Sequence, residues 1–249
     1  MVEGAVTFLP LRGLPDFEPG DDLAQAIVGV VGQIGGLETG DVVVAAHKVV
    51  SKCEGALVHL RDVDPSPEAL AIAGDRDPRL VEVVLRESSA IVRRRGSFLV
   101  TETPHGFVCA GSGVDVSNTT DDDTVVLLPQ DPDRSAGGLR ERLEEQSGRR
   151  LAVVVTDSFG RAWRRGSVDV AVGISGLTAI QDLRGTLDHR GRPLRMSLIA
   201  IADEVAAAAE LVMRKARRVP VVVARGLDDL LGEGRGSDLV RARELDLFR

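Results

Sequence analysis

Short, largely apolar runs are the clearest pattern in this chain. They lie at residues 42–46 (VVVAA), 151–155 (LAVVV) and 219–227 (VPVVVARGL). Because short β-branched runs of this kind are typical of strands covered on both faces, we expect three buried strands. Similar but shorter segments at 5–9 and 125–128 predict two further strands.

Helical spacing of apolar residues appears between these runs. An apolar stripe behind Asp21 or Asp22 predicts a helix to about residue 34, formed by Leu23, Ile27, Val30, Val31 and Ile34. Further helices are expected from Ser66-Pro67, from Asp77-Pro78 to about Ser88, up to Gln146 before Gly148, and from Asp203-Glu204 to the basic segment 214–218. Helices therefore separate most of the predicted strands.

The order of these elements favours an α+β fold. Two alternating segments, 97–103 and 106–111, meet at Pro104-His105 and indicate a β-hairpin. Hairpins interspersed with helical crossovers predict mixed and antiparallel sheets rather than a doubly wound parallel sheet. The sequence contains neither a GxxxxGK[ST] motif nor a GxGxxG motif after a strand, so any nucleotide must be bound without a P-loop or Rossmann motif.

Composition narrows the class of protein. A hydrophobic content of 43% over 249 residues predicts a sizeable core in one large or two small domains. A net charge of −7, one Trp and no Tyr argue against a nucleic-acid-binding protein. We expect no membrane span and no secretory signal, and hence a cytoplasmic location. Cys53 and Cys109 adjoin apolar runs and are expected to be reduced structural thiols.

Candidate chemistry is densest at residues 151–166. The strand is expected to end at Val155, and Gly160 to turn the chain. The polar side chains that follow the strand are Thr156, Asp157, Ser158, Arg161, Arg164 and Arg165. Oxygen ligands suit Mg²⁺ or Mn²⁺, and guanidinium groups match phosphate or carboxylate oxygens. A turn with a solvated basic face is an equally weighted alternative.

Two other polar clusters follow predicted strands. His47, Lys48, Ser51, Lys52 and Glu54 come directly after 42–46. A lysine there could contact a nucleotide phosphate, with an exposed turn as the alternative. The glycine-rich loop 109–118 contains Asp115, Ser117 and Asn118, which could complete a metal site with Asp157, although an Asx turn at Asp115 is favoured.

Seven segments together carry a family resemblance. They are GLPDF (13–17), KVVSKCEG (48–55), GVDVSN (113–118), LLPQDPD (127–133), TDSFGRAWRRG (156–166), VAVGISG (170–176) and ADEVAAAAEL (202–211). In order and spacing, the chain resembles the coenzyme F420:L-glutamate ligase family over nearly its whole length. The resemblance implies an intertwined two-domain α+β fold and a homodimer. We therefore expect residues 1–249 to form one ligase unit, without the C-terminal flavin-binding domain of some actinobacterial relatives.

The resemblance also implies an activity and a set of site residues. The activity is GTP-dependent attachment of L-glutamate to the lactyl carboxylate of the deazaflavin coenzyme precursor, with further γ-linked glutamates possible. Nucleotide contacts are expected at Leu14, Pro15, Asp16, Phe17, Lys52 and Asn118. Metal ligands are expected at Asp115, Asp157 and the Ser158 hydroxyl, for Mg²⁺ or Mn²⁺, with K⁺ as a further candidate cation.

Two positions depart from the family pattern. His47 stands where relatives often have Ser, at a candidate nucleotide contact. Arg214 and Lys215 stand where some relatives have a Gly-Glu pair, so a carboxylate for a second metal is missing there.

The expected chemistry agrees with the residue types. Phosphoryl transfer to a carboxylate, followed by attack of the glutamate amine on the acyl phosphate, requires charge neutralisation and positioning rather than a protein nucleophile. Asp115 and Asp157 would anchor the metal, and Arg161 or Arg164 is expected to orient the acidic deazaflavin substrate or glutamate. Two alternatives remain, a metal-dependent phosphohydrolase and a non-catalytic nucleotide-binding regulator.

Overall fold

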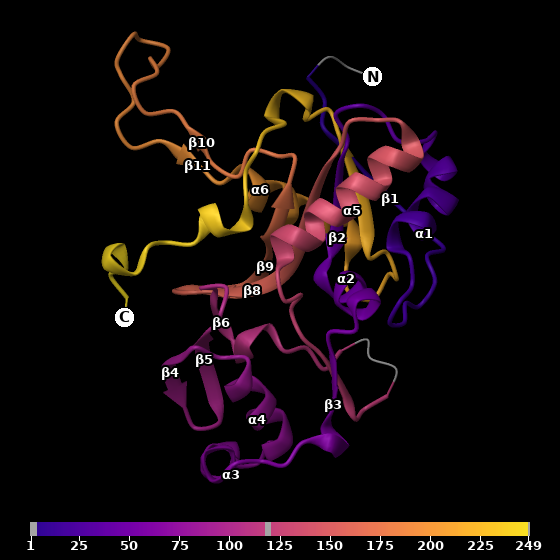
Figure 1. The fold of residues 1–249 in the computed structure, drawn as a ribbon. Helices are drawn as coiled ribbons and strands as arrows, with labels where there is room; N and C mark the ends of the chain where they lie inside the picture. The colour runs from indigo at the N-terminus through magenta and orange to yellow at the C-terminus, as the bar shows by residue number, and fades with distance from the viewer. Residues whose placement is uncertain (1–3, 118–120, 249) are drawn as a thin grey trace.

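The computed structural model describes residues 4–117 and 121–248. At its centre is a five-stranded sheet in the order β1-β12-β2-β8-β9 (Figure 1). The strands are β1 (Thr7–Pro10), β2 (Val42–Ala46), β8 (Ala152–Arg161), β9 (Arg164–Ser175) and β12 (Val221–Arg225). β2 and β8 run parallel, whereas the other three pairings are antiparallel. The three predicted buried strands are thus neighbours in one mixed sheet, in agreement with the predicted mixed and antiparallel sheets.

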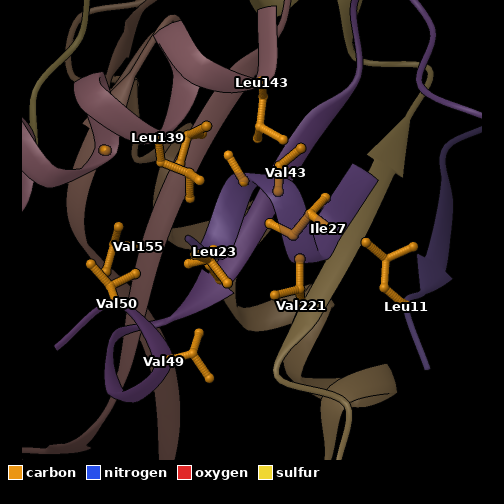
Figure 2. Close-up of a cluster of buried hydrophobic side chains, with 14 of the residues drawn as sticks. Leu11, Leu23, Ile27, Val43, Val49, Val50, Leu139, Leu143, Val155 and Val221 are labelled. Atoms are coloured by element: carbon orange, nitrogen blue, oxygen red, sulfur yellow. The ribbon is translucent and has the colours of Figure 1, made fainter. Parts of the chain in front are cut away.

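Helices cover both faces of this sheet (Figure 1). On one face lie α1 (Leu23–Val30), α2 (His47–Glu54) and α5 (Pro132–Ser147), and on the other lies α6 (Ile201–Met213). Figure 2 shows the first interface, where Leu23, Ile27, Leu139 and Leu143 meet Val43, Val155 and Val221 of the sheet. Burial on both faces explains why β2 and the first four residues of β8 contain no polar positions.

Alternation along β2 links the two cores. Val43 and Ala45 join the cluster beneath α1, α2 and α5, whereas Val42 and Val44 join the cluster beneath α6. Successive strand side chains point to opposite faces, so one apolar run supplies both cores. The sheet is therefore a rigid support for the polar residues that follow its strands.

A second group of elements, residues 57–126, is inserted between α2 and α5, and we call it the insert lobe. It comprises β3 (Leu57–His59), α3 (Pro67–Ala73), α4 (Pro78–Arg86), β4 (Ala90–Arg95), β5 (Phe98–Glu102), β6 (Val108–Ala110) and β7 (Thr124–Val126). β3 pairs with β7, and β4-β5-β6 form a second small sheet. The lobe has hydrophobic clusters of its own and lies below the main sheet in Figure 1.

Several local predictions are confirmed in the insert lobe and around it. Ser66 and Asp77 accept hydrogen bonds from the first turns of α3 and α4, each with proline in that turn. The β5–β6 pairing confirms the hairpin predicted through Pro104. The first helix, by contrast, ends at Val30, and residues 31–34 continue as a 3₁₀ turn closed by Gly35 at φ 83°.

The strand that carries the densest chemistry is longer than predicted. It does not end at Val155 but continues through Asp157 to Arg161, and the chain turns at residues 162–163 rather than at Gly160. The extension is held by antiparallel pairing with β9, in which Ser158 lies opposite Asp169. Cross-strand hydrogen bonds can maintain a strand beyond its apolar core, which hydrophobic pattern alone does not reveal.

An arm between β9 and α6 projects from the body. It contains the short pair β10 (Gln181–Asp182) and β11 (Leu198–Ile199) and ends in the loop at the upper left of Figure 1. Leu187 and Met196 on this arm are 67% and 91% exposed. Among the described residues, no helix is long and apolar enough to cross a membrane.

Candidate functional site

A pocket of about 550 Å³ opens at the end of the main sheet where β2 leads into α2 and β8 leaves the core. Its walls come from residues 14–17, α2, β8, β9, the end of α6 and the segment after α6. Asp115 of the insert lobe completes the lining. The pocket thus joins segments that are far apart in the sequence.

Asp157 lies in this pocket on the extended part of β8. Its Oδ1 accepts a hydrogen bond from the backbone N–H of Ser158 at 2.7 Å, and His47 Nε2 lies 3.4 Å from the same oxygen. Burial opposes ionisation of Asp157, but the nearby His47 imidazole and the Ser158 N–H outweigh burial and lower the pKa of this carboxyl. Asp157 is therefore suited to remain an anionic ligand.

Asp115 faces the same pocket from the insert lobe. Its Oδ1 accepts from the backbone N–H of Ser117 at 2.7 Å, which is the Asx turn favoured by the sequence. Its Oδ2 lies 2.6 Å from Nζ of Lys48, which also donates to Ser117 Oγ at 2.6 Å. Burial acts to raise the pKa of Asp115, but the Lys48 ammonium and the Ser117 N–H lower it below its ordinary value. Asp115 can therefore both form the Asx turn and line the pocket.

Ser158 is tied to the neighbouring strand. Its hydroxyl donates to Oδ1 of Asp169 at 2.5 Å, and Asp169 is 6% exposed. Thr156 Oγ1 lies 3.3 Å from the other Asp169 oxygen and 2.9 Å from the Val170 carbonyl. Burial, reinforced by the nearby Asp157 charge, raises the pKa of Asp169 despite these hydroxyl contacts. Asp169 also lines the pocket.

The remaining lining residues come from three segments. Leu14, Pro15, Asp16 and Phe17 precede α1, and Lys52 lies on α2. Glu210 lies near the end of α6, and Arg214, Lys215 and Arg218 follow that helix. Such a combination of carboxylates with a cationic rim is suited to a polyanion bound together with a divalent cation.

The donor set fits a divalent cation shared with a ligand. Among the described residues, no three His, Cys, Asp or Glu side chains come together as a cage for a metal ion. Asp115 and Asp157 nevertheless offer hard oxygen donors at one pocket. Mg²⁺ is commonly held by one or two carboxylates plus substrate phosphates, so two carboxylates and a hydroxyl suffice.

Comparison with known proteins decides the family. A family model described as F420-0:Gamma-glutamyl ligase matches residues 13–226. The chain belongs to this family. A coenzyme F420:L-glutamate ligase of Methanothermobacter thermautotrophicus is 46% identical, over 98% of this chain and 99% of the relative. Proteins of the same name from Methanopyrus kandleri and Methanocaldococcus jannaschii are 45% and 43% identical, over 93% and 86% of this chain and 92% and 86% of the relatives.

For this member of the F420-0:gamma-glutamyl ligase family, most of the predicted site residues line one pocket. They are Leu14, Pro15, Asp16, Phe17, His47, Lys52, Asp115, Asp157 and Ser158. Arg161 is not part of the described pocket lining, and its Nη2 donates to the Arg165 carbonyl instead. Asn118 lies outside the described residues. The segment after residue 46 forms the helix α2. It is not an exposed turn, because its first residue, His47, is only 1% exposed.

The contacts of two site residues, Lys48 and Asp169, could not be predicted from the sequence. Lys48, a candidate phosphate contact from its sequence position, pairs with Asp115, and Asp169 lines the pocket although no sequence motif includes it. A carboxylate inside the apolar run 168–174 (VDVAVGI) was the available signal for Asp169. The signal for Lys48 was weaker, because its partner lies in a different lobe.

The cysteines of this family member lack activated thiols. Burial, which acts more strongly than neighbouring charges, raises the pKa of Cys53 to about 11 and that of Cys109 to about 12. Both are free thiols. Because the thiolate is the reactive form, neither is suited to nucleophilic catalysis at neutral pH.

Proposed function

We propose that this chain is a coenzyme F420:L-glutamate ligase that uses GTP to join L-glutamate to the lactyl carboxylate of the deazaflavin precursor. The observation that carries the proposal is 46% identity to a protein of that name over 98% of this chain. The pocket supports it, because Asp115 and Asp157 face a rim that includes Lys52 and Lys215. The proposal includes the addition of further γ-linked glutamates and a cytoplasmic reaction.

In this proposal, Asp115, Asp157 and the Ser158 hydroxyl hold Mg²⁺ or Mn²⁺. The ion would neutralise charge on the nucleotide phosphates during phosphoryl transfer. Residues 14–17 and Lys52 bind the nucleotide together with Asn118, and K⁺ is a further candidate cation. His47 is the least suited of the proposed nucleotide contacts, because its side chain is almost fully buried behind Asp157.

The reaction proceeds in two balanced steps. The precursor carboxylate attacks the γ-phosphorus, the bond to the β-phosphate oxygen breaks, and GDP leaves as an acyl phosphate forms. The glutamate amine then attacks the acyl carbon, loses a proton to solvent or a nearby base, and expels inorganic phosphate to leave the amide. The protein contributes orientation, charge neutralisation and exclusion of water, since an acyl phosphate is prone to hydrolysis. Arg161 is proposed to orient an acidic substrate, although it would have to act from beyond the pocket lining.

The proposal extends to assembly. Residues 1–249 would form one ligase unit of two intertwined subdomains, because the insert lobe interrupts the main sheet and supplies Asp115 to its pocket. A homodimer is supported by the exposed apolar side chains of Leu187 and Met196 on the projecting arm.

Coupling of GTP cleavage to amide formation tests the activity. With precursor, glutamate and Mn²⁺ present, GDP, phosphate and glutamylated product should appear in equal amounts, and GTP should persist without precursor. GDP and product are quantified from one reaction by chromatography and mass spectrometry. Rapid GDP formation without precursor would instead identify a phosphohydrolase, and bound but uncleaved GTP a regulator.

A further inference from the structure

The Ser158 hydroxyl is directed toward a buried carboxylate. Asp169 lies opposite Ser158 in the β8–β9 ladder, and the hydroxyl donates to its Oδ1 at 2.5 Å. Asp169 is 6% exposed, so solvent competes little for this bond. The contact joins two adjacent strands of the main sheet and is therefore held in place by the backbone ladder.

The hydrogen-bond inventory of these groups fixes the position of the proton. A serine hydroxyl has one proton and two lone pairs, whereas an ionised carboxylate only accepts. When the Ser158 hydroxyl donates its proton in a hydrogen bond to Asp169, the lone pairs of the Ser158 oxygen remain available for other contacts. Thr156 does not compete for the same carboxylate oxygen, because its hydroxyl lies 3.3 Å from Oδ2 and closer still, at 2.9 Å, to the Val170 carbonyl.

We propose that Asp169 is a positioning residue that holds the Ser158 proton away from the pocket, so that Ser158 presents a lone pair to a divalent cation. This inference rests on the proposed function, in which Ser158 is a ligand. A hydroxyl whose proton pointed into the pocket would repel the cation rather than bind it. Asp169 thus sets the cation affinity of the pocket by acting through Ser158.

Binding of Mn²⁺ to the protein alone tests this role without catalysis. Free Mn²⁺ is measured by electron paramagnetic resonance during titration of the wild type, Asp169→Asn, Ser158→Ala and the double variant. In Asp169→Asn the amide can donate to Ser158 and redirect the hydroxyl proton, so Mn²⁺ affinity should fall about tenfold or more, as for other residues that orient a metal ligand. The double variant should bind no more weakly than Ser158→Ala, because the effect of Asp169 requires the hydroxyl.

Glu210→Gln is the matched control for charge. Glu210 lines the same pocket, and no hydrogen bond from its side chain to Ser158 is found among the described residues. Any loss of affinity in Glu210→Gln should persist in full when Ser158→Ala is added. Independent losses for Asp169→Asn and Ser158→Ala would overturn the proposal, since they would make Asp169 a ligand or a distant charge. Unchanged affinity in Asp169→Asn would overturn it as well.

Two further measurements detect a variant that does not fold and a metal site that is wrongly assigned. Melting temperatures establish that each variant is folded, and Asp169→Glu, which displaces the acceptor by one methylene, replaces Asp169→Asn if the latter does not fold. The same fall is expected of Asp169→Glu, and full affinity would refute the role of Asp169. Asp157→Asn should abolish tight Mn²⁺ binding. If it does not, the metal site of the proposed function is wrong irrespective of the result for Asp169.

Discussion

Two lysines on α2 illustrate how similar side chains differ in role at the residue scale. Lys48 and Lys52 are one helical turn apart and both line the pocket. Nζ of Lys48 lies 2.6 Å from Asp115, where it offsets the charge of that carboxylate. Lys52 lies one turn farther along the helix and lines the same pocket as residues 14–17.

Replacement of Lys52 by Ala should therefore weaken the binding of GTP more than the binding of glutamate. Loss of one phosphate contact is expected to raise KM for GTP about tenfold, or about 1.4 kcal/mol, with little change in KM for glutamate. Initial rates with each substrate varied in turn provide the measurement. Lys52→Arg, which retains the charge, should recover most of the affinity. A change confined to the glutamate dependence would remove Lys52 from the nucleotide site.

At the scale of elements, the site depends on how closely β9 approaches α5. A Cβ on Gly173 would lie 2.2 Å from the Pro132 carbonyl oxygen, a backbone atom that cannot turn aside. Gly173 faces Val155 across the ladder, just below Asp157 on β8. A methyl group there would push α5 and the β8–β9 hairpin apart.

Gly173→Ala is expected to destabilise the protein by about 3 kcal/mol, at the upper end of overpacking effects. Gly160→Ala in the same hairpin is the control, because a Cβ there meets nothing within 4 Å. Its free energy of unfolding should stay within about 0.5 kcal/mol of wild type. Urea denaturation of both variants measures the difference, and equal stability of the two would contradict the close approach of β9 to α5.

Elements maintained by apolar burial could be predicted from the sequence, whereas elements maintained by contacts between distant segments could not. Apolar runs predicted the buried strands because burial on both faces leaves a compositional trace. The extension of β8 to Arg161 left no such trace, since partner-strand hydrogen bonds maintain it. The resemblance supplied Asp115 and Asp157, and they meet in one pocket, but the partnerships of Lys48 and Asp169 depend on distant segments that local pattern does not connect.

At the scale of the whole molecule, the insert lobe has an electrostatic anchor of its own. Glu82 on α4 accepts hydrogen bonds from the Ser66 N–H at 2.9 Å and from Arg86 Nε at 2.8 Å. Contacts with Ser66, followed by the Arg86 guanidinium, lower the pKa of Glu82 from 4.5 to about 2. Ionised Glu82 therefore ties the start of α3 to α4.

The contribution of Glu82 to stability should depend on pH. A carboxyl with a lowered pKa stabilises the fold fully above its ordinary value of 4.5 and loses that effect as pH falls toward about 2. Glu82→Gln should thus be less stable than wild type at pH 7, and the difference should shrink between pH 4.5 and pH 3. Urea midpoints at several pH values test this. Glu141→Gln, an exposed change on α5, is the control, and a difference that grew toward acid would contradict the assignment.

The strand order also has a consequence for how the chain is made. β12 lies between β1 and β2, although it is the last of the five main strands to be synthesised. Until residue 225 has left the ribosome, β1 lacks its partner and β2 presents an open edge, which invites pairing with other chains. The sheet that supports the pocket at the end of β2 therefore cannot be complete before residue 225 has been synthesised, and a partly made chain exposes the β2 edge to pairing with other chains until then.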